Sequence, residues 1–129
     1  DPIELPIGGT DRAVLWSGVL VQEEPPEVAL YWQSPRRGVY LSWYYGGSPA
    51  HRYGTSYSRR LLAIDGVEVR DLDHFLELVR GREDRSAVRL LLQAKSGKEW
   101  VSTLRLDQIW WPTELFERGP AGWTRRVVE

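Results

Sequence analysis

The chain has 129 residues, of which 42% are hydrophobic, and this is enough to build the core of one domain. Its net charge of −1, with both signs interspersed, argues against a general nucleic-acid or membrane-surface binder. The absence of cysteine excludes disulfides and thiolate metal sites, and no apolar run is long enough to span a membrane. Because the chain starts at Asp1 and lacks Met, we expect it to be a piece of a larger protein.

The first third of the chain predicts a lead-in followed by strands. Residues 1–12 have no clear period and read as a linker. Residues 13–22 are rich in β-formers, with a break at Ser17-Gly18, so strands are expected on either side of that break. Pro25 and Pro26 cannot donate to a ladder and predict a turn or protruding loop. The apolar patch at 28–32 fits either a helical turn or a strand.

The stretch 38–69 is the organising segment of the sequence. A strand is expected at 39–44, followed by Gly46-Gly47, and Ser48 and Pro49 can cap and start a short helix that Gly54 would end. A second strand at 61–64 runs into Asp65-Gly66, a dipeptide that favours a tight hairpin turn.

The clearest helix in the sequence is predicted at 71–80. Asp71 and Asp73 lie at the positive end of its dipole, and Gly81 fits its C-terminal cap. Its five apolar residues form two adjoining stripes, so that one stripe can pack on a sheet and the other can line a groove. The alternative is that all five apolar residues belong to the core. They are Leu72, Leu76 and Val79 in one stripe and Phe75 and Leu78 in the other.

The last part of the chain predicts a hairpin and an extension. Runs of β-formers at 87–94 and 99–106 are joined by a turn that contains Gly97. The segment after Asp107 is too apolar to be a plain linker, and we expect Trp110 or Trp111 to pack back on the domain.

Three of these segments carry a resemblance to a known family. Residues 38–42 (GVYLS), 47–50 (GSPA) and 61–66 (LLAIDG), followed by a helix, resemble a PDZ domain of the HtrA/Deg serine proteases. The sequence departs from the family pattern at Ser58-Arg59, where Gly-Asp is usual. The WSGVLVQ segment and the WPTEL segment further resemble the large intracellular Deg-type proteases of fungi and plants, which carry several PDZ domains, some degenerate.

The resemblance implies an α+β fold. We expect a PDZ-like, five- or six-stranded partly open β-barrel or sandwich capped by two helices. Residues 13–106 would form this domain, residues 1–12 the lead-in, and residues 107–129 an extension packing on the domain.

The resemblance also implies a peptide site. An extended or C-terminal peptide would add as a strand beside Val19–Gln22, with its carboxylate on the backbone of residues 17–19 and its last apolar side chain between Val19, Leu76 and Val79. The implied peptide-binding residues are Trp16, Ser17, Gly18, Val19, Leu20, Val21, Leu72, Leu76 and Val79. The alternative is a degenerate module with a closed groove and a structural or assembly role, in which Trp16 and the Pro25-Pro26 loop close the groove.

Catalysis by this chain is not expected. No frame that presents a nucleophile is present, His51 and His74 do not form a metal signature, and no cofactor is implied. The hypothesis is therefore a non-catalytic interaction module that regulates or targets a serine protease. Its expected partners are a peptide or protein C-terminus and the protease domain of the same parent chain, with no nucleic acid. The sequence does not indicate a compartment.

Overall fold

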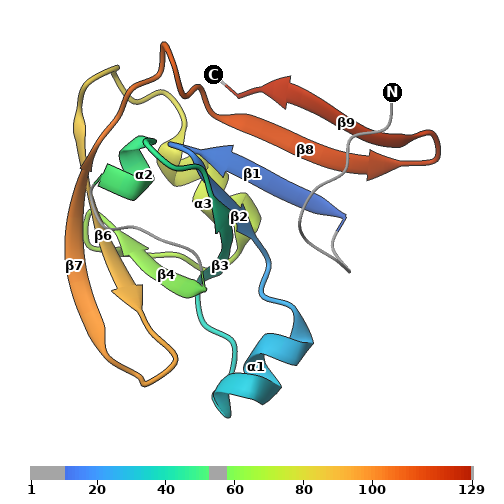
Figure 1. Cartoon of the computed structure of the whole chain (residues 1–129), viewed down its shortest axis with the longest axis vertical. Helices are drawn as coiled ribbons and strands as arrows, with labels where there is room; N and C mark the ends of the chain where they lie inside the picture. Colours follow the sequence, from blue (N-terminus) through green and yellow to red (C-terminus); the bar gives the residue numbers. More distant parts are fainter. Residues whose placement is uncertain (1–10, 53–57, 129) are drawn as a thin grey trace.

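The computed structural model describes residues 11–52 and 58–128. The predictions on the lead-in at 1–10 and on Gly54 lie outside these residues. Figure 1 shows a curved sheet with α3 packed against it and the C-terminal hairpin at one end. The elements are β1 (Arg12–Trp16), β2 (Val19–Gln22), α1 (Pro26–Trp32), β3 (Val39–Tyr44), α2 (Pro49–Arg52), β4 (Arg59–Ile64), β5 (Val67–Glu68), α3 (Leu72–Val79), β6 (Ala87–Gln93), β7 (Glu99–Arg105), β8 (Glu114–Gly119) and β9 (Gly122–Val127).

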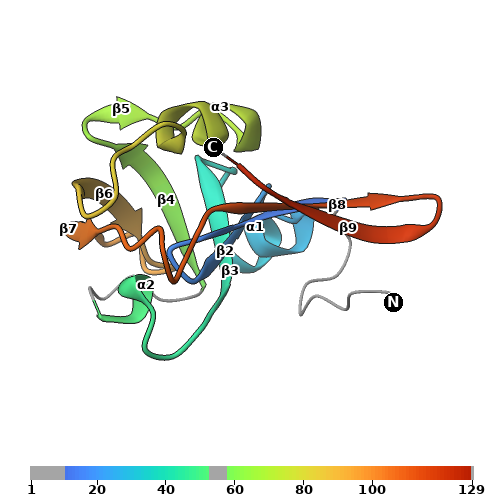
Figure 2. The same cartoon turned by 90° about the horizontal axis from the view of Figure 1, so that it is seen from above.

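The nine strands of the described residues belong to one antiparallel sheet. Their order is β7-β6-β4-β3-β2-β1-β8-β9, with β5 paired beside β4. Within the described residues no pairing joins β7 to β9, so the sheet is open. Figure 2 shows α3 lying across one side of this sheet and the β8–β9 hairpin projecting from it. The predicted α+β class with a partly open sheet is confirmed.

The element count is larger than predicted. The sheet has nine strands rather than five or six, because β5 contributes a two-residue strand and residues 114–127 add the hairpin β8–β9. A third helix is also present, since the ambiguous patch at 28–32 lies in α1. A proline at its first turn supports the helix, because its fixed φ suits that position.

The start of α2 is fixed by local chemistry that the sequence predicts. The Ser48 hydroxyl accepts a hydrogen bond from the His51 backbone N–H at 3.2 Å, and Pro49 begins the helix. Asp65 and Gly66 both have positive φ, at 49° and 81°, and form the tight turn between β4 and β5.

Helix α3 begins and ends close to its predicted bounds. Asp71 is its N-cap, and its carboxylate accepts from the His74 backbone N–H at 2.8 Å. The cap at the other end is Arg80 in an extended conformation, and Gly81 follows with a left-handed φ of 68°. Within the described residues, no helix is long and apolar enough to cross a membrane.

A buried ion pair connects the segment before α1 to the sheet. The Arg60 guanidinium donates to both carboxylate oxygens of Glu24, at 2.5 and 2.9 Å, and neither side chain is exposed. Arg60 also donates to the Ser34 carbonyl and hydroxyl and to Gln93, and it stacks on the Trp32 ring at 4.6 Å. Because these partners lie on both sides of α1 in the sequence, the network holds α1 in one place on the sheet.

Candidate functional site: a strand groove between β2 and α3

The residues predicted to form the peptide site do come together around β2 and α3. Leu72 and Val79 of α3 and Val19 and Val21 of β2 all belong to one hydrophobic core cluster, and Leu76 packs against it. The start of α3 is also tied to the end of β2, because the Leu72 backbone N–H donates to the Glu23 carboxylate at 3.1 Å. Helix and strand therefore border the place where the sequence predicts a peptide groove.

This groove is filled by β1. The strand pairs antiparallel with β2, with Val14 opposite Val21 and Trp16 opposite Val19. The other edge of β2 pairs with β3, so both of its edges are used within the chain. The predicted position for an incoming peptide, beside Val19–Gln22, is thus the position that β1 occupies in this structure.

Side chains of β1 fill the space below α3. Trp16 is only 1% exposed, and its ring meets Phe75 of α3 edge to face, with centroids 5.6 Å apart. Val14, two residues earlier and on the same face of the strand, is also fully buried in the core cluster. The outer edge of β1 is covered as well, because β8 pairs with Arg12–Leu15.

The segment predicted to hold a carboxylate is a tight hairpin turn. Ser17 and Gly18 connect β1 to β2, and both have positive φ, at 52° and 88°. The Ser17 carbonyl accepts from the Ala50 N–H at 3.0 Å, and the Gly18 carbonyl accepts from the Tyr45 N–H at 2.8 Å. Gly18 is required for a second reason, since a Cβ there would overlap with the Ser48 side chain.

The helix residues fit the core alternative better than the groove assignment. Leu72, Phe75 and Val79 are buried, whereas Leu76 and Leu78 are partly buried against the same cluster. Leu20, also predicted for the site, is buried but lies outside that cluster, on the opposite face of β2. The pocket expected between Val19, Leu76 and Val79 is therefore filled with packed side chains, and the role of these residues in binding stays a prediction.

An ion pair connects β1 to α3 at the other end of the groove. Arg12 donates to the Asp73 carboxylate at 2.7 Å. This hydrogen bond and the positive charge of Arg12 lower the pKa of Asp73, and the same hydrogen bond raises the pKa of Arg12. His74, one residue later, accepts a hydrogen bond from the Arg70 backbone N–H at its Nδ1, at 3.1 Å.

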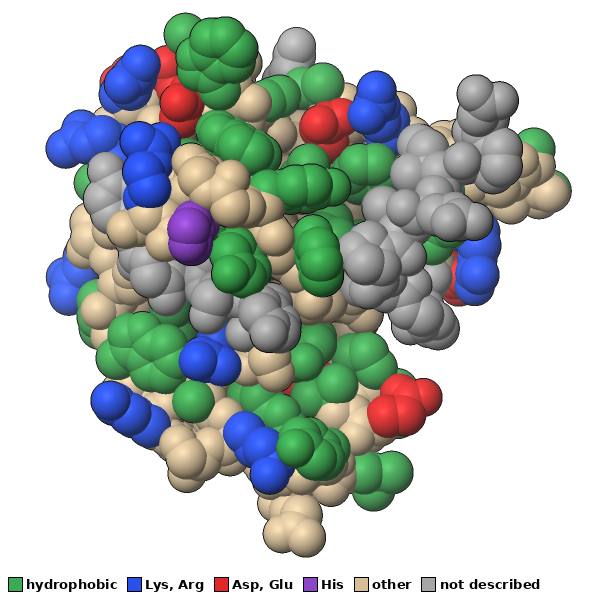
Figure 3. Space-filling view, in the orientation of Figure 1, with side chains coloured by type: hydrophobic (Ala, Val, Ile, Leu, Met, Phe, Trp, Pro, Cys, Tyr) green, Lys and Arg blue, Asp and Glu red, His purple; other side chains and the backbone are tan. Residues whose placement is uncertain are grey.

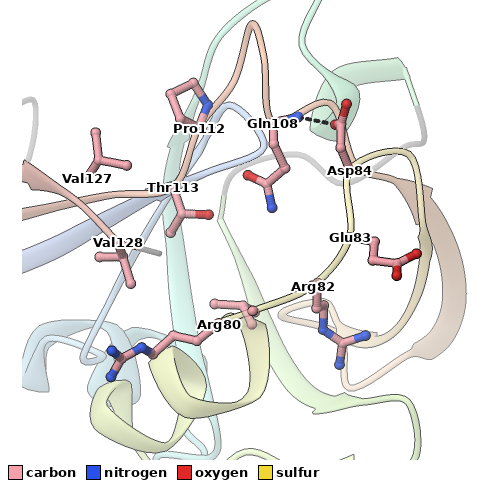
Figure 4. Close-up of a pocket in the computed structure, with 11 residues that line it drawn as sticks. Arg80, Arg82, Glu83, Asp84, Gln108, Pro112, Thr113, Val127 and Val128 are labelled. Carbon is pink, nitrogen blue, oxygen red and sulfur yellow. Dashed lines mark hydrogen bonds between the residues drawn. The ribbon is translucent and has the colours of Figure 1, made fainter.

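A pocket of about 460 Å³ lies at the C-terminal end of α3 and is shown in Figure 4. Residues 79–84 form one wall, and residues 112–113 and 127–128 of the extension form the other. The side chains of Gln108 and Thr113 point into it, and the Gln108 backbone N–H donates to the Asp84 carboxylate at 2.7 Å. Arg82 at the rim donates to Asp65 and to the Leu78 carbonyl. Sequence reasoning missed this pocket, because no local pattern reports that the extension returns to the end of α3.

The extension contacts the predicted carboxylate segment through one of its two adjacent Trp residues. The Trp111 ring lies 6.1 Å from that of Tyr45 and close to Gly18. Trp110 is 77% exposed. Across the described ranges, no group of three or more His, Cys, Asp or Glu side chains is placed to hold a metal ion.

Comparisons with known proteins agree with this architecture. No family model matches the chain. It is 34% identical over 125 residues to Protease Do-like 7 of Arabidopsis thaliana, an alignment that covers 94% of the chain and 11% of that protein. It is 31% identical over 117 residues to the pro-apoptotic serine protease nma111 of Aspergillus terreus, covering 88% of the chain and again 11% of the relative. The chain thus spans about a tenth of the length of the curated relatives it matches.

Solved structures with the same fold include two from HtrA proteins. The HtrA-type protease AlgW with a decapeptide matches 75% of the chain and 29% of its own, with a TM-score of 0.63 and 22% identity. The HtrA3 PDZ domain bound to a phage-derived ligand matches 73% of the chain and 86% of its own, with a TM-score of 0.58 and 15% identity.

The curved antiparallel sheet and the helix beside β2 have the fold of a PDZ domain, as the resemblance implied. The sequence relatives make the likeness more specific, because the chain is similar over most of its length to a segment of two serine proteases, Protease Do-like 7 and nma111, and its fold is that of the PDZ domains of HtrA proteins.

Proposed function

We propose that this chain is a non-catalytic PDZ module of an HtrA/Deg-like serine protease and that its groove is closed, so that it serves a structural or assembly role in the parent protein. The observation that carries the proposal is the pairing of both edges of β2 within the chain. The favoured partner is the protease domain of the same parent chain. The relatives are proteases, and each is about nine times longer than its region of similarity to this chain.

The physical argument is a competition between β1 and a free peptide. Strand addition requires a free edge of β2, so a peptide must first displace β1. A tethered strand acts at an effective concentration of about 1 mM, so a strand whose own intrinsic Kd is about 1 μM weakens a competing peptide by about a thousandfold. Displacing β1 would also expose Trp16 and Val14 and separate β8 from the sheet.

The direction of β1 strengthens this view. The strand runs antiparallel to β2 and ends with Trp16 at the Ser17-Gly18 turn. A C-terminal peptide bound as the sequence predicted would have the same direction and would end at the same turn. In this module, Trp16 takes the place of the ligand's last side chain, and the peptide bond to Ser17 takes the place of its carboxylate.

A second candidate function is binding of a C-terminal peptide by strand addition. It is favoured by the solved structures of AlgW with a decapeptide and of the HtrA3 PDZ domain with its ligand, which share this fold. For the present chain, such binding requires an open state in which β1 has left β2.

A binding screen separates the two functions. The folded chain is screened against a library of peptides with free C-termini, with amidated versions of any hits as controls, and amide NMR shifts report the position of binding. We expect no saturable binding at β2. A hit that is lost on amidation, shifts Gly18 and Val19, and is weakened by Leu76→Asp would overturn the closed-groove proposal. Val19→Asp is unsuitable as a probe because Val19 is fully buried.

A further inference from the structure

Helix α1 presents an apolar surface away from the groove. Leu30 is 79% exposed and Tyr31 is 71% exposed, the largest values among the large apolar side chains on the described helices. Beside them lies an open hollow of about 630 Å³, formed by Pro26 and Ala29 of α1 and by residues 33–36 of the following segment. Single exposed apolar side chains are common, but two neighbouring ones beside an apolar hollow indicate an interaction surface.

This surface is held rigidly. The buried Glu24–Arg60 pair lies before α1, and the contacts of Arg60 with Trp32 and Ser34 lie at and after its end. The helix is therefore fixed at both ends although it has only seven residues. A rigid surface loses little conformational entropy when a partner binds.

Cationic side chains surround the surface. Lys95 lies over the Tyr31 ring at 4.3 Å, which places the turn between β6 and β7 beside α1. Arg36 lines the hollow, and Arg37 reaches Glu99 at 3.4 Å, next to Lys98. Figure 3 shows Lys and Arg side chains interspersed with hydrophobic ones at the lower end of the molecule, where Figure 1 places α1.

The local charge differs from that of the whole chain. The segments that form the surface are α1, residues 33–37, the β6–β7 turn and the first residue of β7, and they carry Arg36, Arg37, Lys95 and Lys98 against Glu27 and Glu99, whereas the chain as a whole has a net charge of −1. Complementary charge steers association and excludes partners of the wrong sign.

We propose that the α1 surface, defined by Leu30, Tyr31, Lys95, Arg36 and the hollow beside them, docks an acidic protein segment that inserts an apolar side chain into the hollow. The carboxylates of the segment meet Lys95 and Arg36, and its apolar side chain packs against Leu30 and Pro26. This inference does not depend on the closed groove, because none of these residues belongs to β1, β2 or α3.

A protein segment fits the surface better than a membrane or a nucleic acid does. Both of those ligands require a broad field of one sign, and here two carboxylates interrupt four cations. The lining of the hollow is mainly apolar and includes Pro26, Ala29, Leu30 and Pro35, which suits the insertion of one side chain.

The test uses the full chain and a synthetic probe of about 15 residues, rich in Asp and Glu, with Leu and Phe spaced by one helical turn. Two control probes replace either the acidic residues by Lys or the Leu and Phe by Ser. The variants are Leu30→Glu and Lys95→Glu, with Val67→Glu as the matched control, since Val67 is an exposed apolar residue on β5 outside this surface. Amide NMR shifts and fluorescence anisotropy report the site and the affinity.

We expect the acidic probe alone to bind, with shifts confined to α1, residues 33–37 and the β6–β7 turn. Leu30→Glu and Lys95→Glu should each weaken it by about tenfold, Val67→Glu should leave it unchanged, and added salt should weaken it. No binding, shifts elsewhere, or equal binding of the Ser-substituted probe would overturn the proposal. Binding of phosphatidylserine vesicles or polyuridine through Lys95 and Leu30, without binding of the acidic probe, would also overturn it.

Discussion

Replacement of Trp16 by Ala tests whether β1 fills the groove. The side chain is 1% exposed, belongs to the same core cluster as Val14, and meets the Phe75 ring edge to face. Truncation of a buried Trp to Ala costs about 3–5 kcal/mol in the free energy of unfolding, and loss of an edge-to-face aromatic pair is worth about 0.5–1.5 kcal/mol beyond the buried area. Part of this loss is offset, because Trp16 Nε1 is buried without a hydrogen-bond partner in the described part of the chain.

We therefore expect Trp16→Ala to lower the free energy of unfolding by about 4 kcal/mol, measured by urea denaturation followed by circular dichroism. Trp16→Phe keeps the aromatic contact and removes the unpaired N–H, so it should cost clearly less than Trp16→Ala. The matched control is Trp110→Ala, which removes a 77% exposed Trp and should change stability by no more than about 0.5 kcal/mol. A loss below about 1 kcal/mol for Trp16→Ala would refute the packing of β1 against α3.

Three further predictions concern the ion pair, the turns and pH. Arg60→Met leaves a buried carboxylate without its partner and should cost about 3–5 kcal/mol in urea unfolding, whereas a cost near zero would contradict the burial of the pair. Gly97→Ala should destabilise the chain by roughly 1 kcal/mol, and Gly18→Ala should destabilise it by well over that amount. Both glycines have positive φ, but only a Cβ at position 18 would overlap a neighbouring side chain. Equal costs for the two variants would contradict that overlap. The pKa of Asp65 is lowered mainly because its carboxylate accepts a hydrogen bond from the Arg89 backbone N–H. The ionised form of Asp65 therefore stabilises the fold above pH about 4, and this stabilisation is lost as the pH falls through the lowered pKa. Asp65→Asn should thus be less stable than the wild type at neutral pH, and the difference should shrink at pH about 3 in thermal unfolding; a constant difference would argue against this role.

Much of the fold could be predicted because its signals are local. The GSPA segment specifies the Ser48 cap and the Pro49 start of α2, Asp65-Gly66 specifies a turn, and the Asp71 cap and Gly81 bound α3. Each of these signals depends on residues within four positions of one another. The resemblance to PDZ domains then supplied the arrangement of the elements.

The state of the groove could not be predicted for the opposite reason. The sequence placed a break at Ser17-Gly18, but a loop and a tight hairpin turn both use such residues, and only the pairing of Trp16 with Val19 distinguishes them. The pairing of the other edge of β1 with β8 is even harder to predict, because the paired residues, such as Arg12 and Glu117, are about 100 positions apart in the sequence. No local period connects two strands so far apart in the chain.

The strand order has a consequence for how the domain is made. In the sheet, β1 lies between β2, its immediate successor in the chain, and β8, which is synthesised about 100 residues after it. At a ribosomal rate of roughly 5–20 residues per second, the outer edge of β1 waits about 5–20 seconds for its partner. Until then, the β1–β2 hairpin presents an apolar strand with one unpaired edge, which is the kind of surface that aggregates or attracts chaperones. The last strands of the domain to leave the ribosome thus complete a sheet that the first strands began, and β1, which joins the early and the late strands, should be among the last parts of the nascent domain to become protected from hydrogen exchange.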